Sequence, residues 1–568
     1  MKKLLILAAA GALALSGCGG GGGSSGGSGG GSGGGGSPQA MKAYDINPVA
    51  RDQVKDGGTL RWGINDFPTQ WNMGHTDGSN AITKKVIDAL MPAPFRSDEK
   101  AVITPNPDYL VDGKITAKNP KQVVTLTLNP KAKWSDGKPI TWADYEAQWK
   151  ALNGKDPAFR GGSVTGYQDI ESVKKGKDDY EVVITFTRNF TDWQSLFAPL
   201  YPKSATGTAE QFNTGWVNKI PVTAGPFKFG SIDKTAKTTT LLRDDAWWGE
   251  KAKLDQIIFR SMESDALISA FANGELDTFD IGPSAPDYAR AKGTSGAVVR
   301  QAAAPDFRHV LFNGESALLK DVKVRQALLK GINRQAIAQS DLQGLDWPIT
   351  LLNNHFFMNT QEGYQDNAGD LGVYNAEQAK QQLDAAGWKL SGQTRMKDGK
   401  ELNLRFVMPS GLQLTKSEGE LLQSMLGQIG VKVTLQAVPS EDFFTKYIIP
   451  GNYDFTAFAY TGTPFPVSSS YSLYANAAKG AGGELQWGNN LGRIGSAEID
   501  AAMNKATAAL DPATARADTN AADKLIWQAV NLVTLYQRPQ NVAAKSTLAN
   551  LGARGFYDLK YQDIGFTA

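Results

Sequence analysis

The sequence predicts an α/β protein with more than one domain. The chain has 568 residues, which is enough for two or three domains. Residues 121–152 combine an alternating β-branched segment, a glycine turn and a segment at helical spacing. Residues 402–437 repeat the order strand, helix, strand. Strands that alternate with helices are typical of α/β folds.

The segment 121–152 forms one compact predicted unit. Its strand covers 123–128, and the Ser-Asp-Gly sequence at 135–137 is a turn in which glycine accepts positive φ. Thr141 is a good helix N-cap, and Asp144 follows three residues later, close to a capping box. We therefore expect a helix over 142–152.

Other segments are predicted from the same periodicities. Alternation predicts strands over 167–173, 180–186 and 238–243, and apolar spacing predicts helices over 81–91, 190–200, 266–273 and 417–429. We expect Trp134, just before the turn at 135–137, and Asp136, within it, to be structural residues.

Composition and motif content exclude several classes of protein. The chain has 59 Lys and Arg against 57 Asp and Glu, a balance that argues against a nucleic-acid-binding protein. The three histidines, His75, His309 and His355, are dispersed, and no pair has metal-ligand spacing. The sequence has neither a Gly-x-Ser-x-Gly elbow nor a Walker loop. We expect no catalytic residue, no metal and no cofactor.

The N-terminal segment predicts export and a lipid anchor. Lys2 and Lys3 precede a short apolar run over 4–15, which is too short to cross a bilayer comfortably as a helix. The sequence Leu15-Ser16-Gly17-Cys18 resembles the bacterial lipobox, in which the signal is cut before a cysteine that is then lipidated. The alternative is a plain signal peptide with an incidental cysteine. Cys18 is the only cysteine of the chain, so no intramolecular disulfide forms.

A glycine and serine tract follows Cys18. Residues 19–37 have no apolar face to bury and predict a flexible tether. We expect it to hold an extracytoplasmic folded part off the surface of the cell membrane.

Several motifs resemble one family of receptors. The pattern Trp134-Ser-Asp-Gly-x-Pro139-Ile-Thr141-x-x-Asp144 resembles the signature of the family 5 extracellular solute-binding proteins, the oligopeptide, dipeptide and nickel receptors of ABC importers. Further segments resemble the family in the same order along the chain: 57–61, 224–228, 246–249, 310–313, 321–327 and 374–388.

The resemblance implies a periplasmic-binding-protein-like fold of class II, also called cluster C. Two α/β lobes are joined by a hinge, and an extra α/β subdomain is added. The expected parts are a signal peptide (1–17), the lipidated cysteine and tether (18–40), lobe 1 (41–79, 213–308 and 538–568), the extra subdomain (80–212) and lobe 2 (309–537). We expect a monomer whose partners are a solute, the transmembrane subunits of an ABC permease and, through the lipid on Cys18, the membrane.

The resemblance also implies which residues face the ligand. Lobe 1 is expected to contribute Asp66, Phe67, Asp280 and Gly282, and lobe 2 His309, Tyr460, Thr463, Trp487 and Asn489. In peptide-binding members an aspartate, three residues after the aromatic residue, pairs with the α-amine of the peptide. Here Thr463 holds that place, and a neutral hydroxyl cannot form the charge-assisted bond.

These residues are therefore compatible with several kinds of ligand. In one possibility, Asp66 or Asp280 supplies the missing charge from the lobe 1 side of the site. In the other, the ligand is a blocked or modified peptide, a glycan or another polar solute. A nickel ligand finds no support in the dispersed histidines. Two other functions remain: an envelope adaptor or biosynthetic regulator that kept the fold without transport, and a secreted hydrolase, which the missing nucleophile and metal ligands disfavour.

Overall fold

The computed structural model describes residues 40–480 and 482–568. The predicted signal peptide, Cys18 and nearly all of the tether lie outside the described residues. Within the described ranges, no helix combines the length and apolar character needed to cross a membrane.

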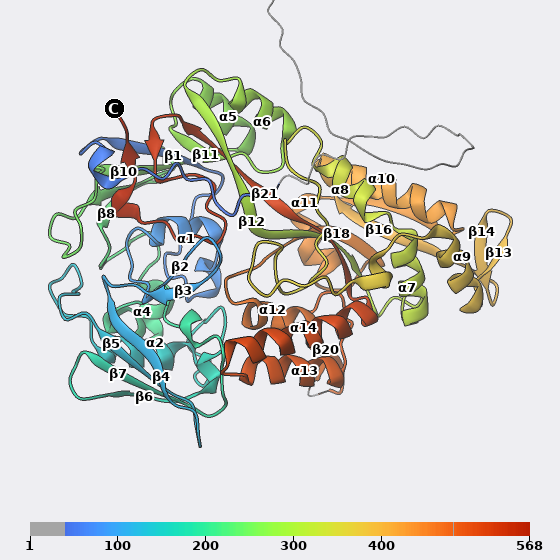
Figure 1. Cartoon of the computed structure of the whole chain (residues 1–568), viewed down its shortest axis with the longest axis horizontal. Helices are drawn as coiled ribbons and strands as arrows, with labels where there is room; N and C mark the ends of the chain where they lie inside the picture. Colours follow the sequence, from blue (N-terminus) through green and yellow to red (C-terminus); the bar gives the residue numbers. More distant parts are fainter. Residues whose placement is uncertain (1–39, 481) are drawn as a thin grey trace, which may run out of the picture. The chain divides into compact units, whose positions relative to one another are not determined.

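A mixed ten-stranded sheet occupies the centre of the described part (Figure 1). Its strands are β1 (Thr59–Ile64), β8 (Phe227–Asp233), β9 (Thr238–Arg243), β10 (Gln256–Ser261), β11 (Thr278–Asp280), β12 (Ala297–Phe312), β16 (Asn403–Pro409), β17 (Lys432–Val438), β18 (Phe455–Thr461) and β21 (Leu532–Lys545). They lie in the order β17-β16-β18-β12-β21-β11-β1-β10-β9-β8. The strand predicted over 238–243 is confirmed as β9.

The long strands β12 and β21 join the two halves of this sheet. They pair with each other in antiparallel fashion, β12 also pairs with β18, and β21 also pairs with β11. The β12–β21 ladder is irregular between Ala303 and Phe307 and again between Arg308 and His309. The predicted lobe boundaries at 308/309 and 537/538 fall inside these two strands. The assignment of residues to two lobes stays a prediction.

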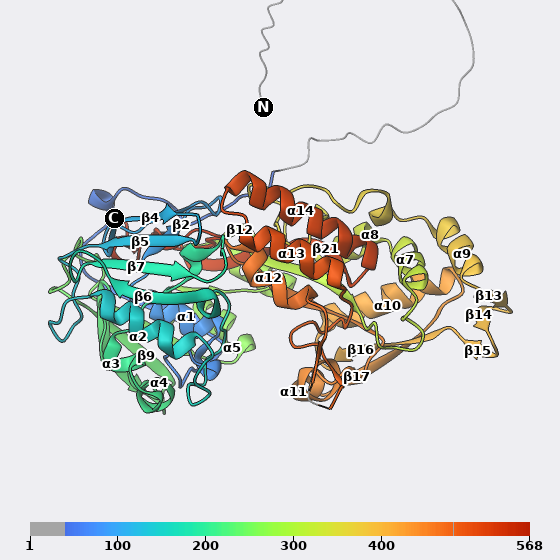
Figure 2. The same cartoon turned by 90° about the horizontal axis from the view of Figure 1, so that it is seen from below.

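A separate antiparallel sheet holds the predicted strand–turn–helix unit. Its strands β4 (Leu110–Ala117), β5 (Val123–Leu128), β6 (Ile170–Lys175) and β7 (Glu181–Phe186) lie in the order β4-β5-β7-β6. Helix α2 (Trp142–Leu152) packs beside β6 (Figure 2). The predicted strand over 123–128 and helix over 142–152 are confirmed, and Thr141 and Asp144 form the capping box.

The side chain of Trp134 connects the turn to this helix by a hydrogen bond. This side chain is 3% exposed, and its indole Nε1 donates to Asp144 Oδ2 at 3.4 Å. The Asp144 carboxylate also accepts from the backbone N–H groups of Thr141 and Lys203. Asp136 lies at the surface and accepts from the backbone N–H of Lys138. These contacts give Trp134 a packing role.

The predicted helix over 190–200 is wrong. The structure has only a 3-10 turn there, Trp193–Ser195. The backbone N–H of Phe190 donates to Gln122 Oε1 at 2.7 Å, and its carbonyl accepts from Gln122 Nε2 at 3.1 Å. A distant side chain thus satisfies the backbone N–H and carbonyl of Phe190, the first residue of the predicted helix. The strand predicted over 167–173 also begins late, because Tyr167–Asp169 is a 3-10 turn before β6.

Helices cover both faces of the second half of the central sheet. Arg308 in β12 points toward one helix layer, whereas its neighbour Phe307 belongs to the apolar cluster that contains Ile526 of the other layer. Figure 1 shows the second layer below β12 and β21. The helices of the described part that concern the site are α8 (Arg334–Asp341) and α10 (Gln413–Gln428) in the first layer and α12 (Pro466–Tyr474), α13 (Ala497–Ala508) and α14 (Pro512–Ala529) in the second.

The described part contains eight further α-helices. They are α1 (Ala81–Ile87), α3 (Lys203–Thr206), α4 (Ala209–Thr214), α5 (Ser264–Ala272), α6 (Ala285–Lys292), α7 (Val322–Gly331), α9 (Ala376–Ala385) and α11 (Ser440–Asp442). The short strands β2 (Phe95–Ser97) and β3 (Ile103–Pro105) pair with each other, as do β19 (Ala478–Lys479) with β20 (Leu485–Gln486) and β22 (Leu548–Ala549) with β23 (Gly565–Phe566), and a small sheet joins β13 (Lys389–Ser391), β14 (Thr394–Lys397) and β15 (Lys400–Glu401).

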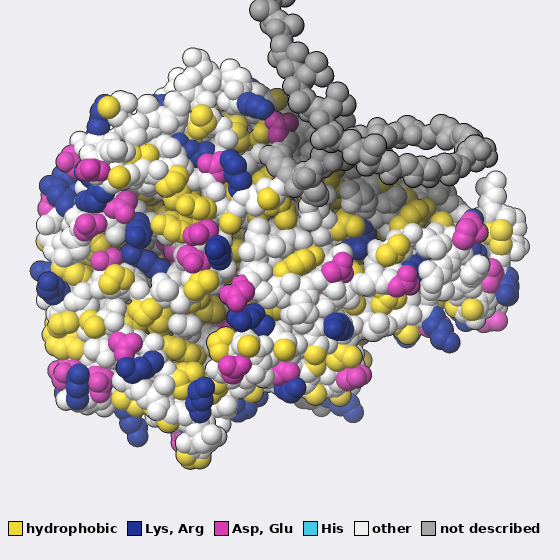
Figure 3. Space-filling model, in the orientation of Figure 1, with side chains coloured by type: hydrophobic (Ala, Val, Ile, Leu, Met, Phe, Trp, Pro, Cys, Tyr) yellow, Lys and Arg dark blue, Asp and Glu magenta, His cyan; other side chains and the backbone are white. Residues whose placement is uncertain are grey.

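Surface charges of both signs are mixed. On the face shown in Figure 3, Lys and Arg side chains lie among Asp and Glu side chains. This mixture agrees with the formal net charge of +2. A mixed surface gives no long-range attraction to a polyanion.

Candidate ligand-binding site

The candidate site lies where three parallel strands end. β16 pairs in parallel with both β17 and β18, so all three have their carboxyl ends at one edge of the sheet. Ligands of open α/β sheets bind outside the carboxyl ends of the strands. The predicted residues Tyr460 and Thr463 lie at or just beyond the end of β18, and His309 lies on the neighbouring strand β12.

His309 and Tyr460 form the centre of this site. Their rings are stacked, with centroids 4.5 Å apart and an angle of 11° between the planes. Phe458 meets the His309 ring edge-on at 4.5 Å. The His309 side chain is fully buried, and both ring nitrogens lack a hydrogen-bond partner among the described residues. Burial, together with the charge of Arg308, holds the pKa of His309 well below its ordinary value, so the imidazole is neutral at pH 7.

Thr463 is held in a local turn. Its hydroxyl accepts from the backbone N–H of Phe465 at 3.1 Å, and its carbonyl accepts from Gln361 Nε2 at 3.4 Å. The side chain therefore stabilises the entry to α12 and carries no charge. An ionic anchor for an amine must come from another residue.

Two carboxylates, those of Asp280 and Asp306, lie near β12 and β21, the strands that join the two halves of the sheet. Asp280 at the end of β11 forms an ion pair with Lys85 of α1. Asp306 lies in the irregular segment of β12, with its carboxylate 3.7 Å from Arg538 of β21. Burial and the charge of Asp280 raise the pKa of Asp306, whereas Arg538 lowers it. The backbone of Gly282 adopts φ of 70°, and its carbonyl accepts from Asn541 Nδ2.

The other predicted residues lie in loops. The Asp66 carboxylate accepts from the backbone N–H of Phe67 at 2.8 Å. Trp487 Nε1 donates to Glu315 at 3.0 Å, and Asn489 Nδ2 donates to Ser472 at 3.3 Å. The structure thus brings His309 and Tyr460 into direct contact, while the remaining predicted residues belong to separate segments. Their role in binding stays a prediction.

An aromatic row that was not predicted from the sequence lies beside Tyr460. Phe458 contacts Tyr460 at 5.1 Å and Phe444 at 5.4 Å, and Phe443 contacts Phe444 at 4.8 Å between ring centroids. Phe458 was accessible to prediction, because residues two apart in a strand share a face. Phe443 and Phe444 begin a π-helix, Phe443–Ile448, which no local pattern announces.

A cavity opens beside this aromatic row. Its volume is about 400 Å³. We call it the β16–β18 pocket, and its lining consists of Arg308, Pro409, Ser410, Gly411, Leu412, Thr415, Ser440, Phe443, Phe444, Ala457 and Phe458.

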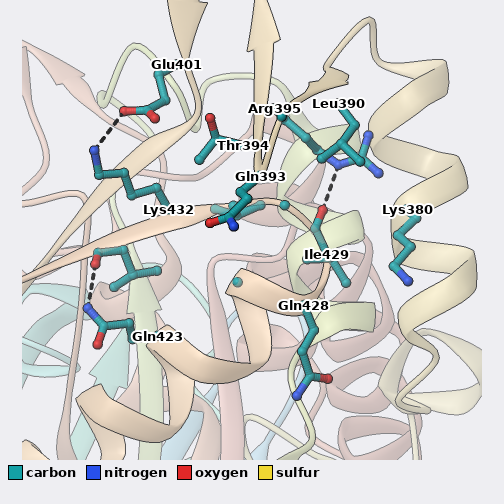
Figure 4. A pocket seen from close by; sticks show the side chains of 15 residues that line it. Lys380, Leu390, Gln393, Thr394, Arg395, Glu401, Gln423, Gln428, Ile429 and Lys432 are labelled. Atoms are coloured by element: carbon teal, nitrogen blue, oxygen red, sulfur yellow. Dashed lines mark hydrogen bonds and ion pairs between the residues drawn. The ribbon is translucent and has the colours of Figure 1, made fainter.

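A larger groove of about 860 Å³ lies at the opposite end of β17 (Figure 4). Several of its polar side chains are bound to the protein itself: Lys432 pairs with Glu401, Arg395 donates to the carbonyl of Ile429, and Gln423 donates to the carbonyl of Val433. It lies at the amino ends of the parallel strands, away from His309 and Tyr460. Within the described ranges, no group of three or more His, Cys, Asp or Glu side chains is placed to hold a metal ion.

Comparison with known proteins agrees with this architecture. Residues 110–482 match the model of the bacterial extracellular solute-binding proteins, family 5 Middle. The chain is 40% identical over 526 residues to the oligopeptide-binding protein OppA of Mycobacterium tuberculosis, covering 92% of this chain and 87% of that protein.

Solved structures share the fold. A periplasmic EDTA-binding protein, EppA, superposes with a TM-score of 0.83 at 24% identity, covering 93% of this chain and 99% of that chain. The oligopeptide-binding protein AppA of Bacillus subtilis, solved with a nonapeptide, superposes with a TM-score of 0.73 at 21% identity, covering 91% of this chain and 100% of that chain. The fold is therefore the periplasmic-binding-protein-like α/β fold, and the chain belongs to the family 5 bacterial extracellular solute-binding proteins.

Proposed function

We propose that this protein is the substrate-binding lipoprotein of an ABC importer. It captures a peptide or peptide-like solute at the carboxyl ends of β16, β17 and β18 and delivers it to the transmembrane subunits of a permease. Cys18 carries the lipid that keeps it at the outer surface of the cell membrane.

The similarity to the oligopeptide-binding protein OppA, 40% identity over 92% of the chain, carries this proposal. The site is compatible with it. Tyr460, stacked on the buried His309, offers a flat aromatic surface without a charge or a nucleophile. Such aromatic surfaces bind extended ligands by contact area.

Binding and a change of conformation are linked in this proposal. Residues of the first half of the sheet, Asp66 and Asp280, and residues of the second half, Tyr460 and Trp487, contact the same ligand. A ligand that binds both sets favours the state in which they are close. The permease recognises that state, and the receptor performs no chemistry.

Native mass spectrometry of the full chain, purified in detergent without added ligand, tests the proposal. We expect co-purified peptides, released by denaturation and identified by fragmentation. A chain that carries no peptide and binds none from a peptide library would contradict it.

The neutral, locally hydrogen-bonded hydroxyl of Thr463 favours one alternative. This is an envelope adaptor or regulator that kept the receptor fold without transport. It predicts that membrane extracts yield a protein partner but no bound peptide, so the same preparation separates the two functions.

A further inference from the structure

The β16–β18 pocket lies where the central sheet opens. β16 and β18 share a single register pair, Phe406 with Phe455, and no further pair joins the two strands. The Thr456 hydroxyl donates to the carbonyl of Val407 at 2.7 Å, directly beyond that pair. The carboxyl-terminal parts of the two strands thus leave a crevice between them.

The chain connections make this crevice a topological switch point. From β16 the chain runs through α10 to β17 on one side. It then returns through α11 and the π-helix Phe443–Ile448 to β18 on the other side of β16. Crevices at such points are the usual ligand sites of open α/β sheets.

The walls of the pocket are largely apolar, and two of them face solvent. Phe444 is 42% exposed and Leu412 is 45% exposed. Phe458 closes the inner side and contacts Tyr460. Phe458 therefore lies between the pocket and Tyr460, so the pocket adjoins the candidate site. Its volume of about 400 Å³ lies within the range of about 300–1,000 Å³ that is usual for ligand pockets.

The floor of the pocket carries no free charge. Arg308 is bound by Glu418 through two guanidinium nitrogens, Nε at 2.6 Å and Nη2, and both side chains are buried. Nη2 also approaches Thr415 Oγ1 at 3.3 Å. A charged group that entered here would compete with a complete ion pair and lose its own hydration.

We infer that the β16–β18 pocket is a specificity pocket for an uncharged apolar side chain, aromatic or leucine-like, of a peptide that lies across Tyr460. Phe444 and Leu412 contact this side chain from the two open sides. This inference rests on the proposed function, because the peptide must first bind at the carboxyl ends of the strands.

The experiment selects peptides with the full chain purified in detergent. The probe is a pentapeptide library in which every position carries Phe, Leu, Ser, Glu or Lys. Bound peptides are separated by size exclusion and sequenced by mass spectrometry. We expect one position to be enriched about tenfold in Phe and Leu over Ser, Glu and Lys, as burial of one large apolar side chain provides.

Two pocket variants and one control locate the effect. Phe444→Ala and Leu412→Ala change exposed side chains, so both are expected to fold, and each should reduce the enrichment to threefold or less at that position only. Ile449→Ala is the control, because Ile449 is 56% exposed just after the same π-helix and does not line the pocket. It should keep the wild-type enrichment.

The outcomes separate the two claims. If peptides bind but neither pocket variant changes the enrichment, or if Glu or Lys is enriched, the pocket inference is overturned and the proposed function stands. If the wild-type chain retains no peptide, the proposed function itself is overturned, and this inference with it.

Discussion

The imidazole of His309 lies parallel to the phenol ring of Tyr460, with 4.5 Å between their centroids. His309 is sealed from solvent by this stack and stays neutral, whereas Tyr460 is partly exposed. Tyr460 is therefore the member of the pair that a ligand can touch. His309 holds the ring of Tyr460 in its orientation.

Tyr460→Ala is expected to weaken peptide binding by about 1–3 kcal/mol, the usual effect of removing a buried anchor. Tyr460→Phe keeps the stacked ring and is the matched control, with binding close to wild type. Isothermal titration calorimetry with a peptide that co-purifies with the protein measures both. Equal affinities for wild type and Tyr460→Ala would place the ligand elsewhere.

Thr463→Asp is expected to shift preference toward peptides with a free α-amine. An aspartate carboxylate can still accept from the Phe465 N–H, as the threonine hydroxyl does, so the turn should survive. Its charge adds a partner for an ammonium group and a desolvation cost when none arrives. Calorimetry should show a larger ratio of affinities between a free and an N-acetylated peptide of the same sequence. An unchanged ratio argues against a peptide terminus at this place.

Trp134→Ala is expected to destabilise the fold without altering the site. The side chain is 3% exposed and bound to Asp144, so its loss should cost about 3–5 kcal/mol of unfolding free energy. Asp136→Ala, two residues away at the surface, should cost less than 1 kcal/mol, roughly the size of a surface change. Urea unfolding compares them. A Trp134→Ala protein with wild-type stability and lost binding would make Trp134 a ligand residue.

The carboxyl group of Asp341 gives the stability a pH dependence. Burial and the neighbouring Glu418 raise its pKa well above the ordinary value of 3.8, and Arg308 opposes them. In the unfolded chain the group loses its proton near pH 4, whereas in the folded chain it keeps it. The native state therefore binds more protons above pH 4, and stability falls as pH rises, by at most about 1.4 kcal/mol per pH unit for one proton.

Urea unfolding at pH 5 and pH 8 tests this slope. Asp341→Asn should lose less stability over this interval than wild type, because its amide does not titrate and its oxygen still accepts from the Tyr536 hydroxyl. Asp346→Asn, at the surface beside Lys292, is the control and should keep the wild-type slope. Parallel curves for wild type and Asp341→Asn would show that Asp341 is ionised in the folded protein.

Cys18→Ala should release the protein from membranes. Acyl chains contribute about 0.8 kcal/mol per buried CH₂, and two or three chains give stable anchoring. Membrane fractionation should find the wild-type protein in the pellet and the variant in the supernatant. A variant that stays in the pellet has another anchor.

Local patterns predicted the elements that local contacts determine. The strand over 123–128 and the helix over 142–152 are confirmed, because alternation and a capping box are encoded in adjacent residues. Over 190–200 the cause is partly local, because Pro199 interrupts a helix, and partly non-local, because the amide of Gln122 binds the backbone of Phe190. Only the end of β12 was predicted, around 310–313, because most of its 16 residues are specified by pairing with β21 far along the chain.

The site was predicted less completely than the fold. Resemblance identified His309 and Tyr460, and their contact is observed. The π-helix that carries Phe443 and Phe444 depends on packing against Phe458, and nothing in its own sequence separates it from an ordinary helix. The floor of the β16–β18 pocket carries no free charge because Arg308 pairs with Glu418, a residue 110 positions away in the sequence.

Three consecutive residues of β12, from Ala304 to Asp306, have no register partner on β21. The ladder between β12 and β21 is interrupted there, and such an interruption bends a strand pair and increases its local twist. The carbonyl of Pro305 accepts from the Gly462 N–H and Asp306 pairs with Thr461, so this stretch is joined to the end of β18. The same interruption therefore positions both the start of the loop that carries Thr463 and the Asp306 carboxylate, which lies 3.7 Å from Arg538. The geometry of the β12–β21 pair and the geometry of the ligand site are therefore coupled.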